Sequence, residues 1–495
     1  MSSDRVTRRE FIKTAGTAAA GLALGCAGIL PSDALSGAER PNILFMIADD
    51  WSFPHAGIHG DKVVKTPTFD KLAREGMLFT NAHCTAPTCT ASRGGVLTGQ
   101  AIHRLDEGAN LYGILPGRFQ VYPDVLEANG YFVGLSGKGW GPGPLEGTGR
   151  TRNPAGPQVR NFREFLAQVP DDKPFCFWFG SHFPHRDYKP GCGADSGMRL
   201  EDVEVPPFFP DTPEVRNDIL DYYWEVQKFD EQCGAVLNNL ELSGRAENTI
   251  VVITSDNGMP FPRSKATLYE IGTHMPLAIR WPAKVKGGRT VDEVVSHTDF
   301  APTFLEAAGL KPPPEMTGRS MMDLLCGDQP ARRDAVFPER ERHVNCRKDN
   351  LAYPARAVRT QDFLYIRNFN PGRWPAGDPK MWVAVGDFGD IDTSPTKTLL
   401  LKRRDDPEIK PFFDLATAKR PAEELFDLKR DPWTVRNLAD DPEYTGVKEK
   451  LAKRLDTWMA KTDDPRAANP NDDRWDKYPY AGVLGEWVFP KPPKK

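Results

Sequence analysis

Short apolar runs that alternate with helical stretches constrain the fold of this chain more than any other feature. Residues 41–48 form one such run, and the β-branched segment 249–254 forms another. Such continuous apolar runs are typical of buried parallel strands, and acidic or amide side chains follow each of them within two residues. Further strands are expected at 131–135, 175–180 and 276–281, and helices at 68–75, 221–242 and 300–308. The alternation predicts an α/β fold with a large mixed, mostly parallel sheet sandwiched by helices.

The pattern changes after about residue 350. Short antiparallel strands are expected at 357–360, 363–367 and 424–428, with a closing amphipathic helix at 447–459. Residues 369–412 hold many Pro, Gly and Asp, so we expect a long irregular insertion there. We therefore predict a large domain at 39–350 and a smaller C-terminal subdomain, an antiparallel sheet plus a helix, at 351–495.

Length and charge exclude several classes of protein. The chain has 495 residues, which suits one large α/β domain plus a smaller one. It carries 64 basic and 68 acidic side chains, and so lacks the basic excess that general nucleic-acid binding requires. No Cys-x-x-Cys pair occurs among the eight cysteines, which gives little support to a zinc site or a redox dithiol.

The N-terminus is typical of an export signal. Paired arginines occur in the segment Thr7-Arg8-Arg9-Glu10-Phe11-Ile12-Lys13, and a mild apolar run follows at 14–29. This pattern indicates a twin-arginine signal over residues 1–38, cleaved after Ser36-Gly37-Ala38. We therefore expect a periplasmic or secreted protein that is exported by the twin-arginine translocon. An amphipathic helix is the alternative. The run is too short and weakly apolar for a stable membrane span, which needs about 20 residues. The residues around Cys26 fit a lipid anchor poorly.

Acidic side chains follow two of the expected strands. Asp49-Asp50 comes after the first apolar run, and Asp256-Asn257 comes after the run at 249–254. Oxygen ligands of this kind suit hard cations such as Ca²⁺ or Mg²⁺. The alternative is that the first pair caps a helix and the second pair forms a turn. Both interpretations remain open at this point.

A further segment favours the metal site. It reads Cys89-Thr90-Ala91-Ser92-Arg93, with Leu97-Thr98-Gly99 after it. This segment resembles the signature of the sulfatase family, and other landmarks of that family follow in order, at 267–270, 296–303, 318–320 and 424–428. The resemblance implies an alkaline phosphatase-like fold, with 39–350 as the catalytic domain. It also implies that a formylglycine-generating enzyme oxidises Cys89 to formylglycine before export. A buried or disulfide-bonded Cys89, paired with Cys84, is the alternative.

The resemblance assigns roles to individual residues. As metal ligands it implies Asp49, Asp50, Asp256, Asn257 and the oxidised Cys89, with Ca²⁺ as the expected ion and Mg²⁺ as the alternative. As further catalytic residues it implies Arg93, Lys138, His185 and Lys265. As substrate-binding residues we predict His182, Glu339, Arg340 and His343. The run that holds the last three, 339–343, is alternatively a solvated charge run.

One position departs from the family pattern. The family has a histidine two residues after the lysine, where this chain has Trp140. Tryptophan cannot transfer a proton in that role, so His83, His103, His182 or a water must substitute.

The segments 255–262 and 353–358 are similar to the N-sulfoglucosamine sulfohydrolase branch. We predict a sulfatase that removes O- or N-linked sulfate from sulfated glycans. The alternatives are a phosphodiester or phosphonate monoester hydrolase and a weakly active glycan-binding homologue.

Overall fold

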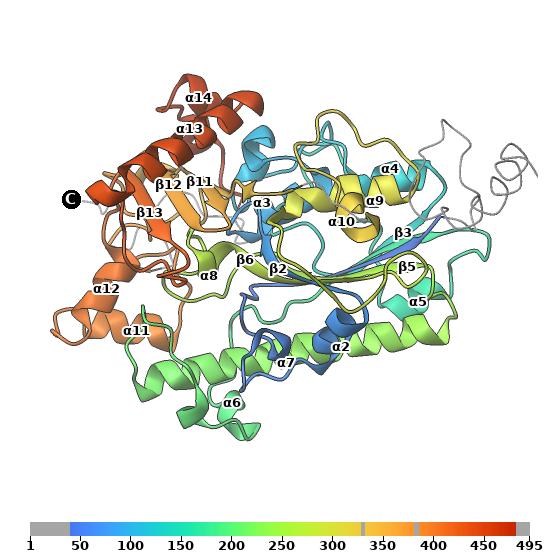
Figure 1. The fold of residues 1–495 in the computed structure, drawn as a ribbon, viewed down its shortest axis with the longest axis horizontal. Helices are drawn as coiled ribbons and strands as arrows, with labels where there is room; N and C mark the ends of the chain where they lie inside the picture. Colours follow the sequence, from blue (N-terminus) through green and yellow to red (C-terminus); the bar gives the residue numbers. More distant parts are fainter. Residues whose placement is uncertain (1–39, 328–331, 381–385, 482–495) are drawn as a thin grey trace, which may run out of the picture.

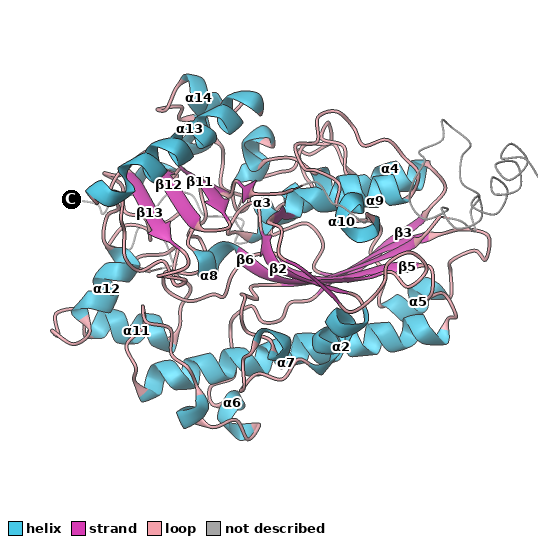
Figure 2. Cartoon of the chain, viewed as in Figure 1, coloured by secondary structure: helices cyan, strands magenta, loops and turns pink. Residues whose placement is uncertain are grey.

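The computed structural model describes residues 40–327, 332–380 and 386–481. These residues form two sheets with helices packed around them (Figure 2). The predicted export signal, its cleavage site and Cys26 lie outside the described residues, so twin-arginine export stays a prediction. None of the helices among the described residues combines the length and the apolar composition that a bilayer crossing requires.

The large sheet has the strand order β3-β4-β1-β5-β6-β2-β7, with β8 paired to β2. Strands β3, β4, β1 and β5 run parallel, whereas β6 is antiparallel to both β5 and β2. The prediction of a mixed, mostly parallel sheet is therefore confirmed. The strands are β1 (Asn42–Ala48), β2 (Met77–His83), β3 (Phe132–Gly137), β4 (Phe175–Gly180), β5 (Thr249–Ser255), β6 (His274–Arg280), β7 (Arg289–Val291) and β8 (Val295–Ser296).

Helices cover both faces of this sheet (Figure 1). One face carries α2 (Pro67–Glu75), α5 (Phe162–Leu166) and the long α7 (Pro213–Leu242), and the other carries α3 (Cys89–Thr98), α4 (Tyr122–Ala128), α9 (Phe300–Ala307) and α10 (Met322–Cys326). The short helices α6 (Cys192–Asp195) and α8 (Glu270–Thr273) complete this part. Two separate apolar cores result, because alternate residues of the fully buried β1 point to opposite faces. The sheet is therefore a rigid platform for the loops at its edge.

The smaller sheet has the order β10-β11-β12-β13, with β9 paired to β11, and its pairs are antiparallel. It contains β9 (Ala335–Val336), β10 (Glu339–Arg340), β11 (Ala355–Thr360), β12 (Phe363–Asn368) and β13 (Glu423–Asp427), and α13 (Thr445–Lys461) packs on it. The short helices α14 (Pro465–Ala468) and α15 (Arg474–Lys477) follow. β9 and β10 precede residue 351, and the domain boundaries given above stay a prediction.

The expectation of an irregular insertion over 369–412 is wrong at its C-terminal end. Helix α11 (Pro395–Lys402) lies inside it, and α12 (Lys410–Thr417) begins inside it. The Ser394 side chain caps α11 by accepting a hydrogen bond from the Lys397 backbone N–H, and Pro395 occupies the first turn. Leu399 and Leu400 are then buried. This capping arrangement stabilises a helix in a segment whose Pro, Gly and Asp content predicts an irregular structure.

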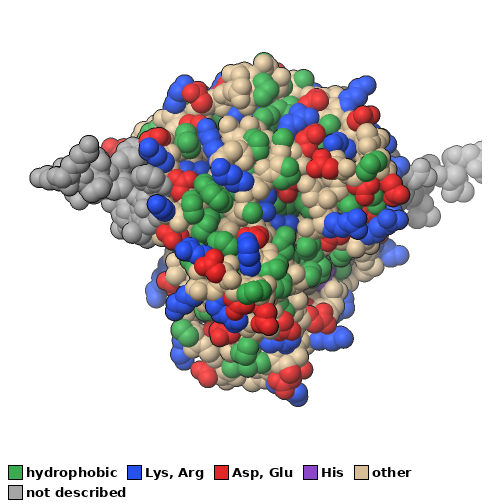
Figure 3. All heavy atoms as spheres, turned by 90° about the vertical axis from the view of Figure 1, so that its left-hand side faces the viewer, with side chains coloured by type: hydrophobic (Ala, Val, Ile, Leu, Met, Phe, Trp, Pro, Cys, Tyr) green, Lys and Arg blue, Asp and Glu red, His purple; other side chains and the backbone are tan. Residues whose placement is uncertain are grey.

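A buried ionic network links the smaller sheet to the segment that follows α13. The Arg356 guanidinium lies 3.0 Å from Glu339, 2.9 Å from Glu341 and 2.7 Å from Asp464, and all four side chains are fully buried. Breaking such a network by removing one partner costs about 3–5 kcal/mol, so it holds the segment after α13 against the smaller sheet. On the outer face of the C-terminal elements, basic and acidic side chains are interspersed (Figure 3).

Candidate active site

Two strand ends bring the acidic side chains together. β1 and β5 are parallel neighbours with Ala48 opposite Ser255, so the residues after them meet at one edge of the sheet. The backbone N–H of Asp50 donates to Asp256 Oδ1 at 3.0 Å, and Asp50 adopts a positive φ of 78°. Asp49, Asp50 and Asp256 are all buried. Asp50 therefore holds a strained backbone conformation at the point where the three carboxylates converge.

Helix α3 adds a sulfur atom to this cluster. Cys89 is its first residue, is 2% exposed, and donates a hydrogen bond from Sγ to Asp49 Oδ1 at 3.5 Å. Ligand atoms of Asp49, Asp50, Cys89 and Asp256 all lie within 4.8 Å of one another. Burial, together with the nearby carboxylates, raises the pKa of the Cys89 thiol well above its usual value, although Lys138 acts in the opposite direction. No disulfide occurs among the seven cysteines that the structure describes.

Three cations face the three carboxylates. Arg93 Nε lies 2.7 Å from Asp256 Oδ2, and Lys265 Nζ lies 2.7 Å from Asp50 Oδ2. Lys138 Nζ lies 2.6 Å and 2.7 Å from the two oxygens of Asp49. Burial opposes ionisation of Asp49, but Lys138, His185 and Arg93 outweigh it and hold its pKa well below the usual value. Burial raises the pKa of Asp50, although Lys265 acts in the opposite direction. Three acidic side chains thus face three basic ones.

Local backbone geometry places two of these cations. β3 ends at Gly137, which has a φ of 72°, and a Cβ there would lie 2.0 Å from the Gly180 carbonyl oxygen. Only glycine permits the turn that directs Lys138 toward Asp49. Arg93 lies one helical turn after Cys89, so both side chains share a face of α3. Its guanidinium also donates to the carbonyl oxygens of Lys138 and Gly139 at 2.8 and 3.1 Å.

The donor set fits a hard divalent cation. Asn257 Nδ2 donates to Asp50 Oδ1 at 2.7 Å and to the Gly258 carbonyl oxygen at 3.1 Å. Asn257 Oδ1, however, is buried and has no hydrogen-bond partner among the described residues. An orphaned amide oxygen beside three carboxylates matches the oxygen ligands that Ca²⁺ and Mg²⁺ prefer. Asp49, Asp50, Asp256 and Asn257 would hold such an ion, with the group at position 89 beside it.

A histidine follows β4 on the same edge of the sheet. His185 Nε2 lies 3.9 Å from Asp50 Oδ2, and the side chain is 38% exposed. Its Nδ1 pairs with the Arg186 carbonyl oxygen at 2.5 Å, which requires the proton to be on Nδ1. The ring is therefore held by one nitrogen and presents the other to the cluster.

The comparisons with known proteins agree with this arrangement. Residues 41–141 and 158–310 match the family model described as Sulfatase, and residues 263–376 match the model described as N-sulphoglucosamine sulphohydrolase, C-terminal. The human N-sulphoglucosamine sulphohydrolase is 30% identical over an alignment of 519 positions, gaps included, which covers 94% of this chain and 97% of that protein. The chain belongs to the sulfatase family. The prediction that it is an enzyme of the sulfatase type is thereby confirmed.

Two further relatives extend the comparison. An ulvan-active sulfatase of Formosa agariphila is 30% identical over 449 residues, covering 87% of this chain and 82% of the relative. A protein solved in complex with its substrate, D-glucosamine-2-N,6-O-disulfate, superposes with a TM-score of 0.62 at 21% identity, covering 88% of this sulfatase and 99% of that chain. At that identity the superposition supports the fold alone.

The remaining predicted residues of this sulfatase fall into two groups. His343 lies near the cluster, because its Nδ1 is 2.6 Å from Oγ1 of Thr88, the residue that precedes Cys89. His182 is exposed, and partial burial lowers its pKa while the nearby Asp49 acts in the opposite direction. Arg340 instead pairs with Asp390 at 2.6 Å. Glu339 belongs to the ionic network around Arg356.

The alternative of a solvated charge run over 339–343 is wrong. All five side chains of the run are at most 4% exposed. The acids and arginines of the run find partners inside the protein, such as Arg356 for Glu339 and Asp390 for Arg340. A charged sequence is buried here because Glu339, Arg340 and Glu341 meet opposite charges and Arg342 donates to backbone carbonyl oxygens.

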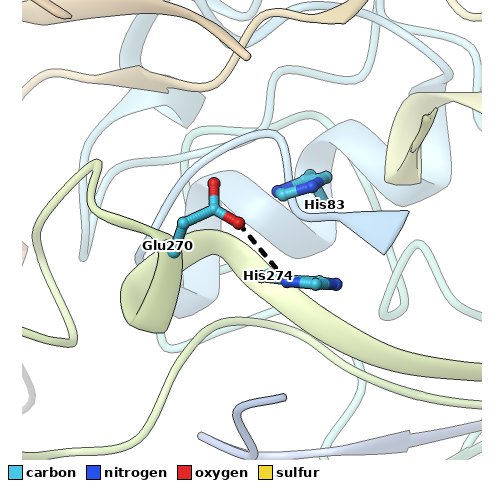
Figure 4. A group of neighbouring side chains, drawn as sticks. All are labelled: His83, Glu270 and His274. Atoms are coloured by element: carbon cyan, nitrogen blue, oxygen red, sulfur yellow. Dashed lines mark ion pairs between the residues drawn. The ribbon is translucent and has the colours of Figure 1, made fainter. Parts of the chain in front are cut away.

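The histidines proposed to replace the family histidine at Trp140 differ in position. His103 is bonded to Glu339 at 2.7 Å, next to the ionic network around Arg356. His83 stacks on His274 with ring centroids 4.7 Å apart, and His274 Nδ1 lies 3.4 Å from Glu270 (Figure 4). Neither bonds to the carboxylate cluster. Of the three, only His182 has Asp49 among the charges that shift its pKa.

Sequence reasoning missed one acid at this site. Asp392, which precedes α11, lies 3.2 Å from Lys265 Nζ through its Oδ2 atom. The segment that carries it shows no periodic pattern, so nothing in the sequence links it to the strand ends. The pairing of Lys265 with both Asp50 and Asp392 appears only in three dimensions.

Proposed function

We propose that this sulfatase removes sulfate groups from sulfated glycans, with position 89 as the site of the nucleophile. The observation that carries the proposal is the cluster itself, in which Cys89 lies beside three buried carboxylates and three cations. The names of the relatives support the substrate class, since they act on N-sulphoglucosamine and on ulvan. The C-terminal model match makes N-sulfoglucosamine the first substrate to test.

Two groups would complete the site. Formylglycine at position 89, formed from Cys89 by a formylglycine-generating enzyme, would supply a hydrated aldehyde as the nucleophile. A calcium ion, with magnesium as the alternative, would be held by Asp49, Asp50, Asp256 and Asn257 and would supply positive charge next to the sulfate. The orphaned Asn257 Oδ1 supports this ligand set.

The chain's own cations would bind the sulfate. Arg93, Lys138 and Lys265 present nitrogen atoms around the carboxylates, and the latter two side chains are 13% and 5% exposed. A sulfate ester repels an approaching nucleophile through its negative charge, which these cations would offset in the transition state. The planar Arg93 guanidinium is anchored by Asp256 and by backbone carbonyl oxygens, so it would need no reorganisation during the reaction.

His185 would protonate the leaving group. The Arg186 carbonyl oxygen holds Nδ1–H, so the proton to be transferred would be on Nε2. Its exposure of 38% leaves room for a sugar oxygen or nitrogen to approach. A positioned general acid typically contributes about 10²–10⁴ to the rate. His182 would be the histidine available on the side of Asp49 and Lys138.

The test combines mass spectrometry with turnover. The chain should be made in a host that contains a formylglycine-generating enzyme, and the peptide over Cys89 should be about 18 Da lighter than the thiol form, as aldehyde formation requires. The modified protein should release sulfate from glucosamine N-sulfate or from a sugar O-sulfate. Cys89→Ala should abolish release without changing the fold by circular dichroism.

Other outcomes separate the alternatives. If sulfate esters and glucosamine N-sulfate are untouched while bis(4-nitrophenyl) phosphate is cleaved, the chain is a phosphodiester hydrolase and the proposal fails. If Cys89 stays a thiol in the modifying host, the result favours a weakly active glycan-binding homologue and contradicts the proposed catalytic mechanism. Retained activity in Cys89→Ala would remove position 89 from the mechanism.

A further inference from the structure

Asp392 lies next to a cation of the candidate site without belonging to the predicted ligand set. Its Oδ2 atom is 3.2 Å from Lys265 Nζ, and the same ammonium group is 2.7 Å from Asp50 Oδ2. The Asp392 side chain is 25% exposed, whereas those of Lys265 and Asp50 are 5% and 0% exposed. Of these three groups, Asp392 is therefore the one that a ligand from solvent can reach.

Asp390, on the same segment, is an example of a carboxylate with a structural role. Asp390 is 2% exposed and accepts hydrogen bonds from Arg340, Arg347 and the backbone N–H of Val344. These bonds fix the segment 386–394 against the 340–347 region. Asp392 makes no such bonds to the described residues, and its contact with Lys265 is an ion pair. The Oδ2 atom is buried beside Lys265, so Oδ1 is the oxygen that keeps acceptor positions free for a ligand.

The electrostatic surroundings keep Asp392 ionised. Burial opposes its ionisation, but Lys265, His185 and His343 outweigh burial and lower its pKa to about 2. At neutral pH the group is thus a pure acceptor of hydrogen bonds. It also lies near His185, the residue on the side where the leaving sugar would be.

We propose that Asp392 binds the sugar that carries the sulfate, by accepting hydrogen bonds from its hydroxyl or amide groups. This inference rests on the proposed function and makes it more specific. Lys265 would link the two parts of the substrate, with its ammonium group facing the sulfate and Asp392 facing the sugar. A carboxylate at this place also repels a second sulfate. The site therefore prefers a sugar whose hydroxyl groups next to Asp392 are unmodified.

The experiment compares substrates with and without a sugar. Wild type, Asp392→Asn and the control Asp405→Asn are prepared in formylglycine form. Asp405 is an exposed acid between α11 and α12 that makes no bond to the described residues of the site. Rates are measured on 4-nitrophenyl sulfate, on glucosamine N-sulfate, on N-acetylglucosamine 6-sulfate and on D-glucosamine-2-N,6-O-disulfate. Inhibition of 4-nitrophenyl sulfate turnover by glucosamine and by N-acetylglucosamine measures sugar binding without the chemical step.

The expected result is a selective loss. In Asp392→Asn, kcat/KM on the preferred monosulfated sugar falls about tenfold to a hundredfold more than on 4-nitrophenyl sulfate, and the inhibition constant of the matching free sugar rises by a similar factor. Activity on the disulfated sugar falls less, because the variant no longer repels the second sulfate group. Asp392→Glu recovers part of the sugar selectivity, and Asp405→Asn behaves as wild type.

The outcomes separate this inference from the proposed function. Equal losses on the aryl and sugar sulfates, with unchanged inhibition by free sugar, overturn the inference while leaving a working sulfatase. Wild-type protein in formylglycine form that releases no sulfate from any of the four substrates overturns the proposed function, and the inference with it. A melting temperature within about 2 °C of wild type shows that Asp392→Asn is folded.

Discussion

Replacing Lys138 by methionine removes the cation that contacts Asp49 and keeps most of the side-chain length. Lys138 Nζ lies 2.6 Å and 2.7 Å from the two Asp49 oxygens, and the side chains are 13% and 2% exposed. A charge-assisted bond to a buried carboxylate contributes about 2 kcal/mol. For a chain of 495 residues the unfolding entropy is about 1 kcal/mol per degree, so the melting temperature should fall by about 2 °C.

The effect on turnover should be larger than the effect on stability. Removing one donor that stabilises transition-state charge costs about 10²–10³ in kcat, so Lys138→Met should release sulfate at that reduced rate. The control is Lys71→Met, because Lys71 pairs with Glu75 at 3.6 Å on the surface, with side chains 71% and 41% exposed. That pair is worth less than about 0.5 kcal/mol, and its loss should change neither quantity. A Lys138→Met enzyme with more than a tenth of wild-type kcat refutes the proposed role.

The stability effect should also depend on pH. The folded pKa of Asp49 is depressed, as burial is outweighed by Lys138, His185 and Arg93. The stabilisation is therefore present above the unfolded pKa of about 3.9 and is lost as the pH falls through the folded pKa. The difference in melting temperature between wild type and Lys138→Met should therefore narrow as the pH falls below about 3.9. A constant gap from pH 7 to the acid limit contradicts an ionised Lys138–Asp49 pair.

Three further outcomes are expected. Dialysis against a chelator should abolish sulfate release, and added Ca²⁺ should restore it. In the same titration Asn257→Leu should require about tenfold more Ca²⁺, because it lacks the amide oxygen proposed as a ligand. His185→Gln should lose about 10²–10⁴ in kcat on a sugar sulfate but much less on 4-nitrophenyl sulfate, whose leaving group needs no proton. Glu270→Gln should lower the melting temperature at pH 7 by about 3 °C, since it breaks the buried pair with Arg359. The gap should narrow on acidification, because Arg359, His274 and His83 outweigh burial and hold the pKa of Glu270 well below its usual value.

The sequence predicts best those elements whose local pattern agrees with their burial. β1 and β5 are apolar along their whole length and fully buried, and both were expected within one residue of their ends. β2 was missed because only alternate positions in its first half are buried and its composition is mixed. Helix α7 begins at Pro213, eight residues before the predicted start at residue 221. The Thr212 side chain caps it by accepting a hydrogen bond from the Val215 backbone N–H. The cap signal was present, and the weak periodicity of the first two turns obscured it.

The site divides in the same way. Cys89 and Arg93 lie on one helix, so their spacing alone puts them on one face. Asp49 and Asp256 meet because β1 and β5 are parallel neighbours, a pairing that no local pattern specifies. Asp392 depends on the tertiary path of a segment without periodicity, and Asp390 anchors that path through Arg340 and Arg347. Such a residue is fixed by long-range ion pairs, and a local sequence pattern contains no information about them.

Trp140 shows why a family residue cannot simply be exchanged in this chain. Its side chain is 4% exposed in the core that contains Leu105, and a Cβ on Gly94 would lie 3.9 Å from its Nε1. Asn153 fixes its backbone through two hydrogen bonds, of 3.0 Å and 2.9 Å. A histidine at this position would lose packing worth about 3 kcal/mol and would bury a polar ring in an apolar cluster. The loop after β3 is therefore built around tryptophan, and in the proposed mechanism the role of the family histidine would fall to another element, for which the loop after β4 offers His182.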